Sequence, residues 1–299
     1  MKQFANQLKH YRKRQGMSQK SLAKALGVGQ TTIANYETGL RTPHTQLLTK
    51  LATVLGVSID DLMGRMAHEE NHLSGPETPD LERLEEELLH VLLKGDTNEV
   101  TRHLRHILDL HLPLSSLYEE VLAPCLFKVG DLWESGQIDV FTEHYISYTA
   151  ETFIGHLMQS RPSHMGSTGK FMGLAIEGEM HVIGIKMLSH LMTDRGWQTY
   201  FLGNNLSNGL ALKALVHQIP DVVGISCTST GHLAKVRDLI EAIKREEVLR
   251  GTKIIVGGQA FCGENDLWKS LGADAYGSDL NQSVSKIEAL INRNEVNHE

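Results

Sequence analysis

The sequence lacks the features of secreted, membrane-spanning or disulfide-built proteins. Its 299 residues contain three cysteines, Cys125, Cys227 and Cys262, which lie far apart and form no CxxC pair. Such spacing excludes a disulfide framework, argues against a structural zinc site and suits a reducing compartment. No apolar run approaches the length of a membrane span, and the charged, amphipathic first residues do not form a secretory signal. We therefore expect a cytoplasmic protein with no membrane partner.

Acidic residues are scarce in the first 65 residues. This segment holds ten Lys/Arg and three Asp/Glu, whereas the whole chain has a net charge of −7. A basic head on an acidic body is expected when only the head contacts a polyanion such as DNA. A chance imbalance of solvated charges is the alternative.

Changes in hydrophobic periodicity divide the chain into four parts. Residues 1–65 carry apolar residues at helical spacing and predict five short helices, and the polar residues 66–79 predict a linker. Residues 80–163 show four further helical patterns, one of them with a bend at Pro124, which predict an antiparallel four-helix bundle.

Strands alternate with helices in residues 168–299. The five apolar runs that predict strands are 171–176, 197–202, 221–226, 252–256 and 273–276. This alternation predicts an α/β Rossmann-like (flavodoxin-like) fold with a doubly wound parallel sheet of five strands. Sheets of this kind bind ligands at the carboxyl ends of their strands.

The loop after the first predicted strand, EGEMHVIG (177–184), combines an acid, a histidine and a glycine. A neutral imidazole is a good ligand for a late first-row metal, here offered by His181. Glu179 can accept the second ring N–H and fix the tautomer. Gly184 allows the backbone to approach a bulky group. Taken alone, the same pattern also fits a histidine on a surface loop.

The spacing of later motifs favours the ligand interpretation. Ser226 follows Gly184 after 41 intervening residues, and the pair Gly257-Gly258 follows Thr228 after 28. This register resembles the cobalamin-binding domain shared by methionine synthase and methylmalonyl-CoA mutase, over about the last 130 residues.

The resemblance implies a cobalt site with one protein ligand. His181 would replace the cofactor's own benzimidazole on cobalt, with Glu179 holding it. Ser226, Gly257 and Gly258 would line the slot for the displaced nucleotide tail. The chain departs from the family pattern in two positions: Glu179 replaces Asp and keeps the acceptor, and Thr228 replaces Leu and makes the wall of the slot more polar.

The bundle contains a second motif, Trp133 followed after nine residues by Glu143-His144. With LLKGD (92–96) and VLAPCLFKVGDLW (121–133), it resembles the CarH family of adenosylcobalamin-dependent, light-sensing repressors. The resemblance implies that Trp133 covers the upper corrin face, that Glu143 accepts from ribose hydroxyls and that His144 assists. CarH proteins usually have a MerR-type head, which this chain lacks, and can have a histidine where this chain has Glu134. The plain alternative is a core tryptophan followed by a charged helix start.

Residues 17–43 resemble the helix-turn-helix of phage repressors and the XRE family. Gln19 is placed to clamp a phosphate, and Gln30 can bond adenine or a backbone oxygen. The other residues that would face DNA are Thr31, Thr32 and Asn35, with Arg41 and His44 near phosphates. A five-helix protein-interaction domain is the alternative.

Together these motifs predict a cobalamin-dependent transcriptional regulator rather than an enzyme. We expect it to bind a double-stranded DNA operator as a homo-oligomer, a dimer or a tetramer, and to hold adenosylcobalamin with His181 on cobalt. If the CarH resemblance extends to behaviour, light would change the oligomeric state and the DNA affinity. The alternatives are a light-insensitive cobalamin sensor, a corrinoid methyl carrier or mutase subunit, and a storage or scaffold protein with a vestigial site.

Overall fold

The computed structural model describes residues 2–15, 17–55, 57, 62, 79–160, 168–204, 206–263 and 266–295. The chain divides into two compact units, residues 1–77 and 78–299, and each is considered by itself. The predicted linker 66–79, apart from Pro79, and most of the predicted fifth N-terminal helix lie outside the described residues.

The first unit is a small helical domain. Its described helices are α1 (Lys2–Arg14), α2 (Gln19–Leu26), α3 (Gln30–Glu37) and α4 (Thr45–Leu55). Ser18 caps α2 by accepting the Ser21 N–H at 3.0 Å, and Gly27 ends the helix in the left-handed conformation at φ +69°. Leu8, Leu22 and Ile33, one from each of three helices, meet in a common buried core.

The second unit begins with the predicted bundle. Its helical segments are α6 (Leu81–Lys94), α7 (Thr97–Asp109), α8 (Leu114–Ser116), η1 (Leu117–Leu122), α9 (Ala123–Glu134) and α10 (Val140–Ser160). Asp80 and Asp96 cap α6 and α7 with their side chains, and Gly95 ends α6. No described helix in either unit is both long and apolar enough to cross a membrane.

The helix predicted over about 114–135 differs from expectation in its middle. In place of a simple bend at Pro124, residues Leu117–Leu122 form a π-helical segment, η1. Proline lacks an N–H and its ring crowds the carbonyl four residues earlier, so a wider turn just ahead of it relieves that clash. The Ala123 N–H accordingly donates to the Tyr118 carbonyl, five residues back.

The second half of this unit is a five-stranded parallel sheet, as predicted, with strand order β2-β1-β3-β4-β5. The strands are β1 (Lys170–Ala175), β2 (Gln198–Phe201), β3 (Val222–Ser226), β4 (Lys253–Gly257) and β5 (Ala275–Gly277). The longer helices are α11 (Ile183–Asp194), α12 (Asn208–Gln218), α13 (Leu233–Arg245), α14 (Leu267–Leu271) and α15 (Leu280–Glu295).

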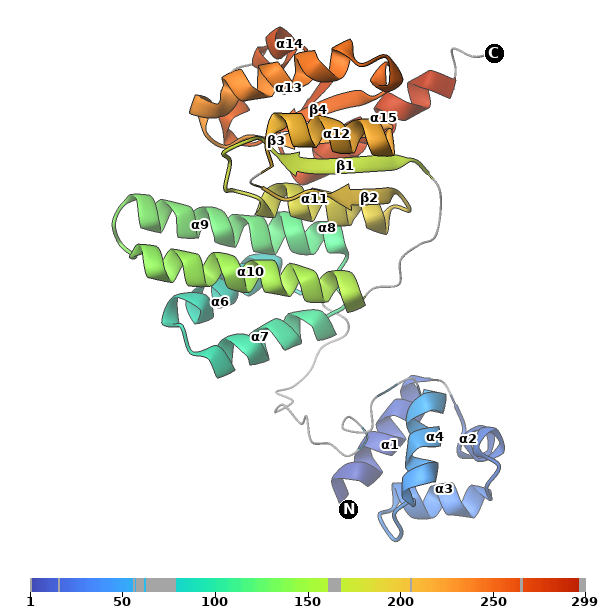
Figure 1. Ribbon diagram of the computed structural model, residues 1–299. Helices are drawn as coiled ribbons and strands as arrows, with labels where there is room; N and C mark the ends of the chain where they lie inside the picture. The colour runs from blue at the N-terminus through green and yellow to red at the C-terminus, as the bar shows by residue number, and fades with distance from the viewer. Residues whose placement is uncertain are drawn as a thin grey trace. The chain divides into compact units, whose positions relative to one another are not determined.

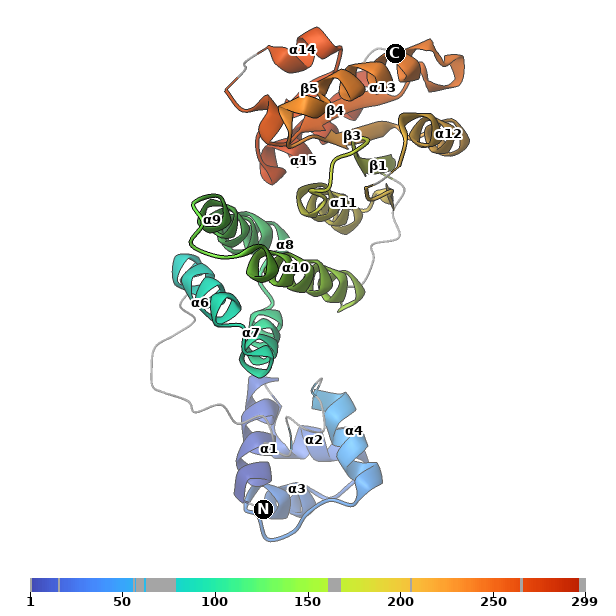
Figure 2. The ribbon, with the colours of Figure 1, turned by 60° about the vertical axis from the view of Figure 1, so that its left-hand side comes forward.

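Alternate side chains of each strand reach different cores. Phe171 packs with α11, α15 and the bundle, whereas its neighbour Met172 packs with α12 and α13. Figures 1 and 2 show α11 between the sheet and the bundle, with α12 on the opposite side of the sheet. A buried hydrogen bond of 2.6 Å joins the Tyr118 hydroxyl of η1 to His190 Nδ1 of α11. The bundle and the sheet therefore share one continuous core.

The strand order has a switch point between β1 and β3. The chain leaves β1 towards one edge of the sheet and β3 towards the other, so the loops after these two strands diverge and leave a crevice. The loop that carries Glu179 and His181 follows β1, and the loop that carries Thr228 follows β3.

Candidate functional site

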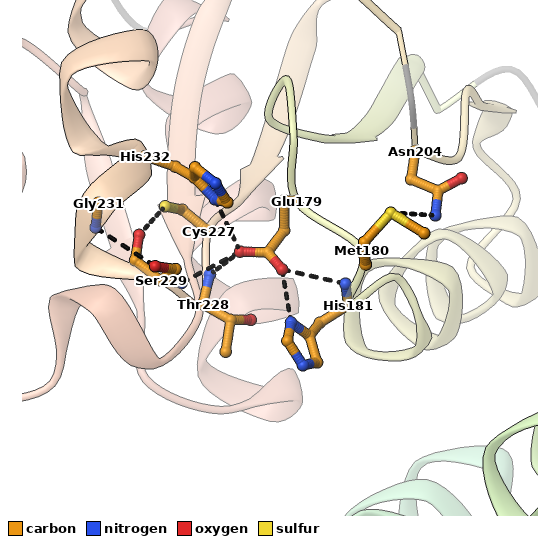
Figure 3. A network of polar contacts seen from close by, with 9 residues as sticks. All are labelled: Glu179, Met180, His181, Asn204, Cys227, Thr228, Ser229, Gly231 and His232. Carbon is orange, nitrogen blue, oxygen red and sulfur yellow. Dashed lines mark hydrogen bonds and ion pairs between the residues drawn. The ribbon is translucent and has the colours of Figure 1, made fainter. Parts of the chain in front are cut away.

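Glu179 joins the two loops at the switch point. Its carboxylate is buried, with 1% of the residue exposed, and accepts hydrogen bonds from the backbone N–H groups of Thr228 at 2.8 Å and Ser229 at 3.1 Å. The other carboxylate oxygen accepts from the His181 backbone N–H at 3.0 Å and lies 2.5 Å from His181 Nδ1 (Figure 3). The loops after β1 and β3 are therefore tied together through one side chain.

The same contacts fix the charge of Glu179 and the tautomer of His181. Burial alone raises the pKa of Glu179, but the donors of His181, Thr228 and Ser229 outweigh it and lower that pKa to about 2. An ionised carboxylate only accepts hydrogen bonds, so Nδ1 of His181 carries a proton, and in the neutral imidazole the lone pair is then on Nε2. The His181 side chain is 72% exposed and its Nε2 makes no hydrogen bond to any described residue. Metal-binding histidines typically donate their second ring N–H to a carboxylate, and Glu179 is such a carboxylate for His181.

His232 is a further neighbour that the sequence did not indicate. It lies at the end of the short 3-10 turn η2 (Thr230–His232), and its Nδ1 is 3.5 Å from the second oxygen of Glu179. That nitrogen is buried and has no hydrogen-bond partner among the described residues. Nothing in the spacing of the sixteen histidines distinguished His232 from those on solvated helix faces.

A cavity of about 240 Å³ lies at the carboxyl ends of the strands. It extends from the carboxyl ends of β3, β4 and β5 to the start of α11, the start of α15, and the η1–α9 segment of the bundle. The predicted residues that line it are Gly184, Ser226, Gly257 and Gly258. Thr228, predicted as part of the same wall, is not among the lining residues, and the contact that it makes at the site is its backbone N–H on Glu179.

The glycines of the cavity serve two purposes. A Cβ on Gly258, where φ is +104°, would lie 2.4 Å from the Cys227 carbonyl oxygen, so this glycine is required by the close approach of the loops after β3 and β4. A Cβ on Gly184 would meet no atom within 4 Å, so the packing of the chain does not itself require this glycine. The site thus offers an oriented imidazole, open space at Gly184 and a cavity lined by Gly184, Ser226, Gly257 and Gly258, and these features fit a bulky ligand that contains a metal.

The three predicted bundle residues lie at the ends of two adjacent helices. Trp133, near the end of α9, is 50% exposed, and Glu143 and His144 lie near the start of α10. The Glu143 carboxylate is held by Ser147 Oγ at 2.6 Å and by His144 Nδ1 at 2.7 Å. Among the described residues no hydrogen bond or ion pair joins these three to Glu179 or His181.

Exposed aromatic residues accompany Trp133 on the bundle. Phe127 of α9 and Phe141 of α10 are 67% and 76% exposed, and Phe127 also lines the cavity. All three aromatic side chains are accessible on α9 or α10, and Phe127 connects this part of the bundle to the cavity.

Most of the predicted DNA-facing residues of the first unit lie on or near α3. Gln30, Thr31 and Arg41 are exposed, and Thr32 and Asn35 are half-buried. Gln19 also makes a contact within the domain: its amide nitrogen donates to Glu37 at 2.8 Å, which leaves its second amide N–H for the predicted phosphate contact. Glu37 also binds the buried Arg12, so Gln19 belongs to a network that fixes α2 against α3.

Segments in both units of the chain match known protein families. Residues 8–62 match the helix-turn-helix family model. Residues 84–158 and 169–285 match two models described as B12 binding domains, the first over the bundle and the second over the sheet.

Individual relatives are corrinoid proteins. The chain is 25% identical over 182 residues to dimethylamine corrinoid protein 1 of Methanosarcina acetivorans, covering 59% of this chain and 83% of that protein. It is 23% identical over 217 residues to a corrinoid protein of Desulfitobacterium hafniense, covering 70% and 97%. The solved structure of the monomethylamine corrinoid protein of Methanosarcina barkeri covers 69% of this chain and 98% of its own, with 17% identity and a TM-score of 0.60, and so shares the fold. The chain thus joins a helix-turn-helix segment to a bundle and a sheet that both match B12 binding domains.

Proposed function

We propose that this protein is a cobalamin-dependent, DNA-binding transcriptional regulator that has no enzymatic activity. The observation that carries the proposal is His181, whose Nδ1 is fixed by the buried Glu179 while its side chain is exposed, three residues before Gly184 of the cavity lining. His181 would hold the cobalt, and Ser226, Gly257 and Gly258 would line the space for the nucleotide tail. A helix-turn-helix on the same chain gives such a site an output, DNA binding in the cytoplasm.

The finer proposal concerns the upper ligand and the trigger. Adenosylcobalamin supplies a cobalt–carbon bond that visible light cleaves. Trp133 offers an exposed indole for the upper corrin face, and Glu143 has carboxylate oxygens for ribose hydroxyls, with His144 beside it. Loss of the adenosyl group would remove these contacts from the bundle, and the equilibrium between homo-oligomeric states, dimer or tetramer, would shift by linkage.

Oligomeric mass under light tests this trigger. We expect the protein with adenosylcobalamin in darkness to differ in mass from the protein with hydroxocobalamin, and green light to convert the first into the second. Trp133→Ala should blunt the difference and leave His181 ligation unchanged, because the two residues contact opposite corrin faces. Light scattering before and after illumination gives the masses. Trp268→Ala, on α14, is a tryptophan control away from the bundle, and its folding is checked by circular dichroism because Trp268 packs against the sheet core. Equal masses in all conditions would favour a light-insensitive cobalamin sensor.

A corrinoid methyl carrier is the second candidate, because the matched relatives are corrinoid proteins of methylamine systems. The dimethylamine relative aligns with 59% of this chain, and a carrier has no evident use for a helix-turn-helix segment over residues 8–62. Salt-sensitive binding of the full chain to DNA would therefore separate the two functions.

DNA recognition should depend on Gln30 and Gln19 in different ways. We expect a pseudo-palindromic operator, and Gln30→Ala should relax the base preference at one position per half-site at a cost of about 1–3 kcal/mol. Gln19→Ala should weaken binding to all sequences alike, because it removes a contact that positions α2 against Glu37. Titrations with the operator and a scrambled duplex measure both effects. A change in base preference with Gln19→Ala, or its absence with Gln30→Ala, would reverse the assignment.

A further inference from the structure

The sheet forms one wall of the cavity, and its strand register shows which side chains reach that wall. Ser226, Gly257 and Gly277 end β3, β4 and β5 and pair side by side across the three strands. Gly224 and Ile255 form the next row inward on the same side, because residues two apart on a strand point to the same face. Both rows line the cavity. This wall therefore has one hydroxyl at the edge of the sheet and no polar side chain in the row behind it.

Apolar side chains close the inner end of the cavity. A Cβ on Gly224 would lie 2.7 Å from Phe171 Cζ and 3.2 Å from Ile185 Cδ1, so these two side chains fill the space over that glycine. Ile185 and Leu188 line the cavity from α11, and both belong with Ile255 to the core that the sheet shares with the bundle. The backbone of the inner row is paired within the sheet. A group buried at this end would meet aliphatic side chains.

The remaining polar side chains of the lining gather at the start of α15 and are engaged there. Ser278 Oγ donates to the Asp279 carboxylate at 2.8 Å, and that carboxylate accepts the Gln282 N–H at 2.7 Å. Ser283 Oγ donates to the Asp279 carbonyl at 2.6 Å. Glu119 reaches the same helix start from η1 and interacts with its N–H groups. On the sheet side of the cavity, the polar side chain of the lining is the hydroxyl of Ser226.

This distribution of polar groups bears on the lower base of a cobamide, the nucleotide base that His181 would replace on cobalt. A benzimidazole base has one unsubstituted ring nitrogen, and one hydroxyl is enough to donate to it. A purine base such as adenine has further ring nitrogens and an amino group. Both bases are bicyclic and similar in size, so a cavity of about 240 Å³ admits either, and polarity decides between them.

We infer that the cavity receives the lower base and selects cobamides with a benzimidazole base over cobamides with a purine base. This inference rests on the function proposed above. Ser226 serves the single ring nitrogen of a benzimidazole, whereas Ile185, Leu188 and Ile255 leave the additional polar groups of a purine without partners. One buried polar group without a partner weakens binding by about tenfold, so the preference should be at least of that order.

Three corrinoids test the inference: cobalamin, the cobamide with an adenine lower base, and cobinamide, which has no lower base. Their dissociation constants are measured by absorbance titration of the full chain. We expect the wild-type protein to bind cobalamin about tenfold more tightly than the adenine cobamide. Leu188→Gln places an amide at the inner end and should shift the ratio of the two affinities about tenfold towards adenine. Detaching the base from cobalt costs the same with every variant, so a change in this ratio reports on the cavity.

Leu191→Gln is the matched control, because Leu191 is a buried leucine of the same helix and core but does not line the cavity. It should leave the ratio unchanged. Ser226→Ala should weaken cobalamin binding about tenfold and leave cobinamide binding unchanged. Retained cobinamide binding shows that a variant is folded, and where both glutamine variants lose it, the wild-type comparison and Ser226→Ala decide.

Three results would each overturn the inference alone. These are a wild-type protein that binds the adenine cobamide as tightly as cobalamin, folded glutamine variants with equal affinity ratios, and an unchanged cobalamin affinity in Ser226→Ala. A wild-type protein that binds none of the three corrinoids overturns the proposed function, and this inference with it.

Discussion

His181→Ala is expected to weaken cobalamin binding by about a hundredfold or more and to shift the visible absorption spectrum of the bound corrin. Loss of a hydrogen-bonding partner behind a metal-bound histidine typically costs about 10–100-fold in affinity, and loss of the ligand itself should cost at least as much. The spectrum should change because a nitrogen ligand is replaced by water or by nothing. Absorbance titration of the purified variant measures both effects at once.

Two further variants make this test specific. Glu179→Gln keeps the size of the side chain but weakens the hold on His181 Nδ1, and we expect an intermediate loss of about 10–100-fold. His217→Ala removes an exposed histidine of α12 and should change nothing. If His181→Ala bound cobalamin with unchanged spectrum and affinity, His181 would not be the ligand, and the proposed function would lose its main support.

The strands and the Glu179–His181 pair could be predicted from the sequence, because hydrophobic periodicity and residue spacing determine them. All five strands begin and end within about two residues of the predicted runs, because each is a short apolar run bounded by polar residues. The loop after β1 was identifiable because an acid and a histidine two residues apart can form one hydrogen-bonded unit. Glu179 and His181 do form it, at 2.5 Å.

What the sequence did not reveal depends on contacts between distant segments. Thr228 was expected to contribute its side chain to the wall of the nucleotide slot, but the contact that it makes is from its backbone N–H to Glu179. Residue type does not indicate which backbone N–H groups will donate hydrogen bonds to a side chain. Glu119 and His232 resemble any acid or histidine until the fold brings one to the cavity and the other to Glu179. The π-helical segment before Pro124 could not be predicted from the sequence either, because its apolar residues have the spacing of an α-helix with a bend at the proline.

Glu37→Leu is expected to lower the free energy of unfolding of the first unit by about 3–5 kcal/mol, the range for breaking a buried ion pair from one side. Arg12 is buried, and its guanidinium binds both oxygens of Glu37, with Nη2 at 3.0 Å from Oε2. Removal of Glu37 leaves that cation buried, with the Met17 carbonyl, at 2.6 Å from Nη1, as its one hydrogen-bond acceptor among the described residues. Arg12→Met combined with Glu37→Leu should recover much of the loss, because neither charge then remains buried.

All three tryptophans lie in the second unit, so unfolding seen by far-ultraviolet circular dichroism without a change in tryptophan fluorescence reports the first unit.

Burial raises the pKa of Glu37, but hydrogen bonds from Arg12 and Gln19 outweigh it and lower that pKa below its ordinary value. A lowered native pKa means that the ion pair contributes fully above the unfolded-state value of about 4.3 and is lost as the pH falls through the native value. The wild-type unit should therefore lose stability below about pH 4 more steeply than Glu37→Leu does. Because Glu37 also holds Gln19 at the start of α2, the variant should bind operator DNA more weakly even where it stays folded. Equal pH profiles for both proteins would show that the pair adds nothing to the stability of the DNA-binding unit.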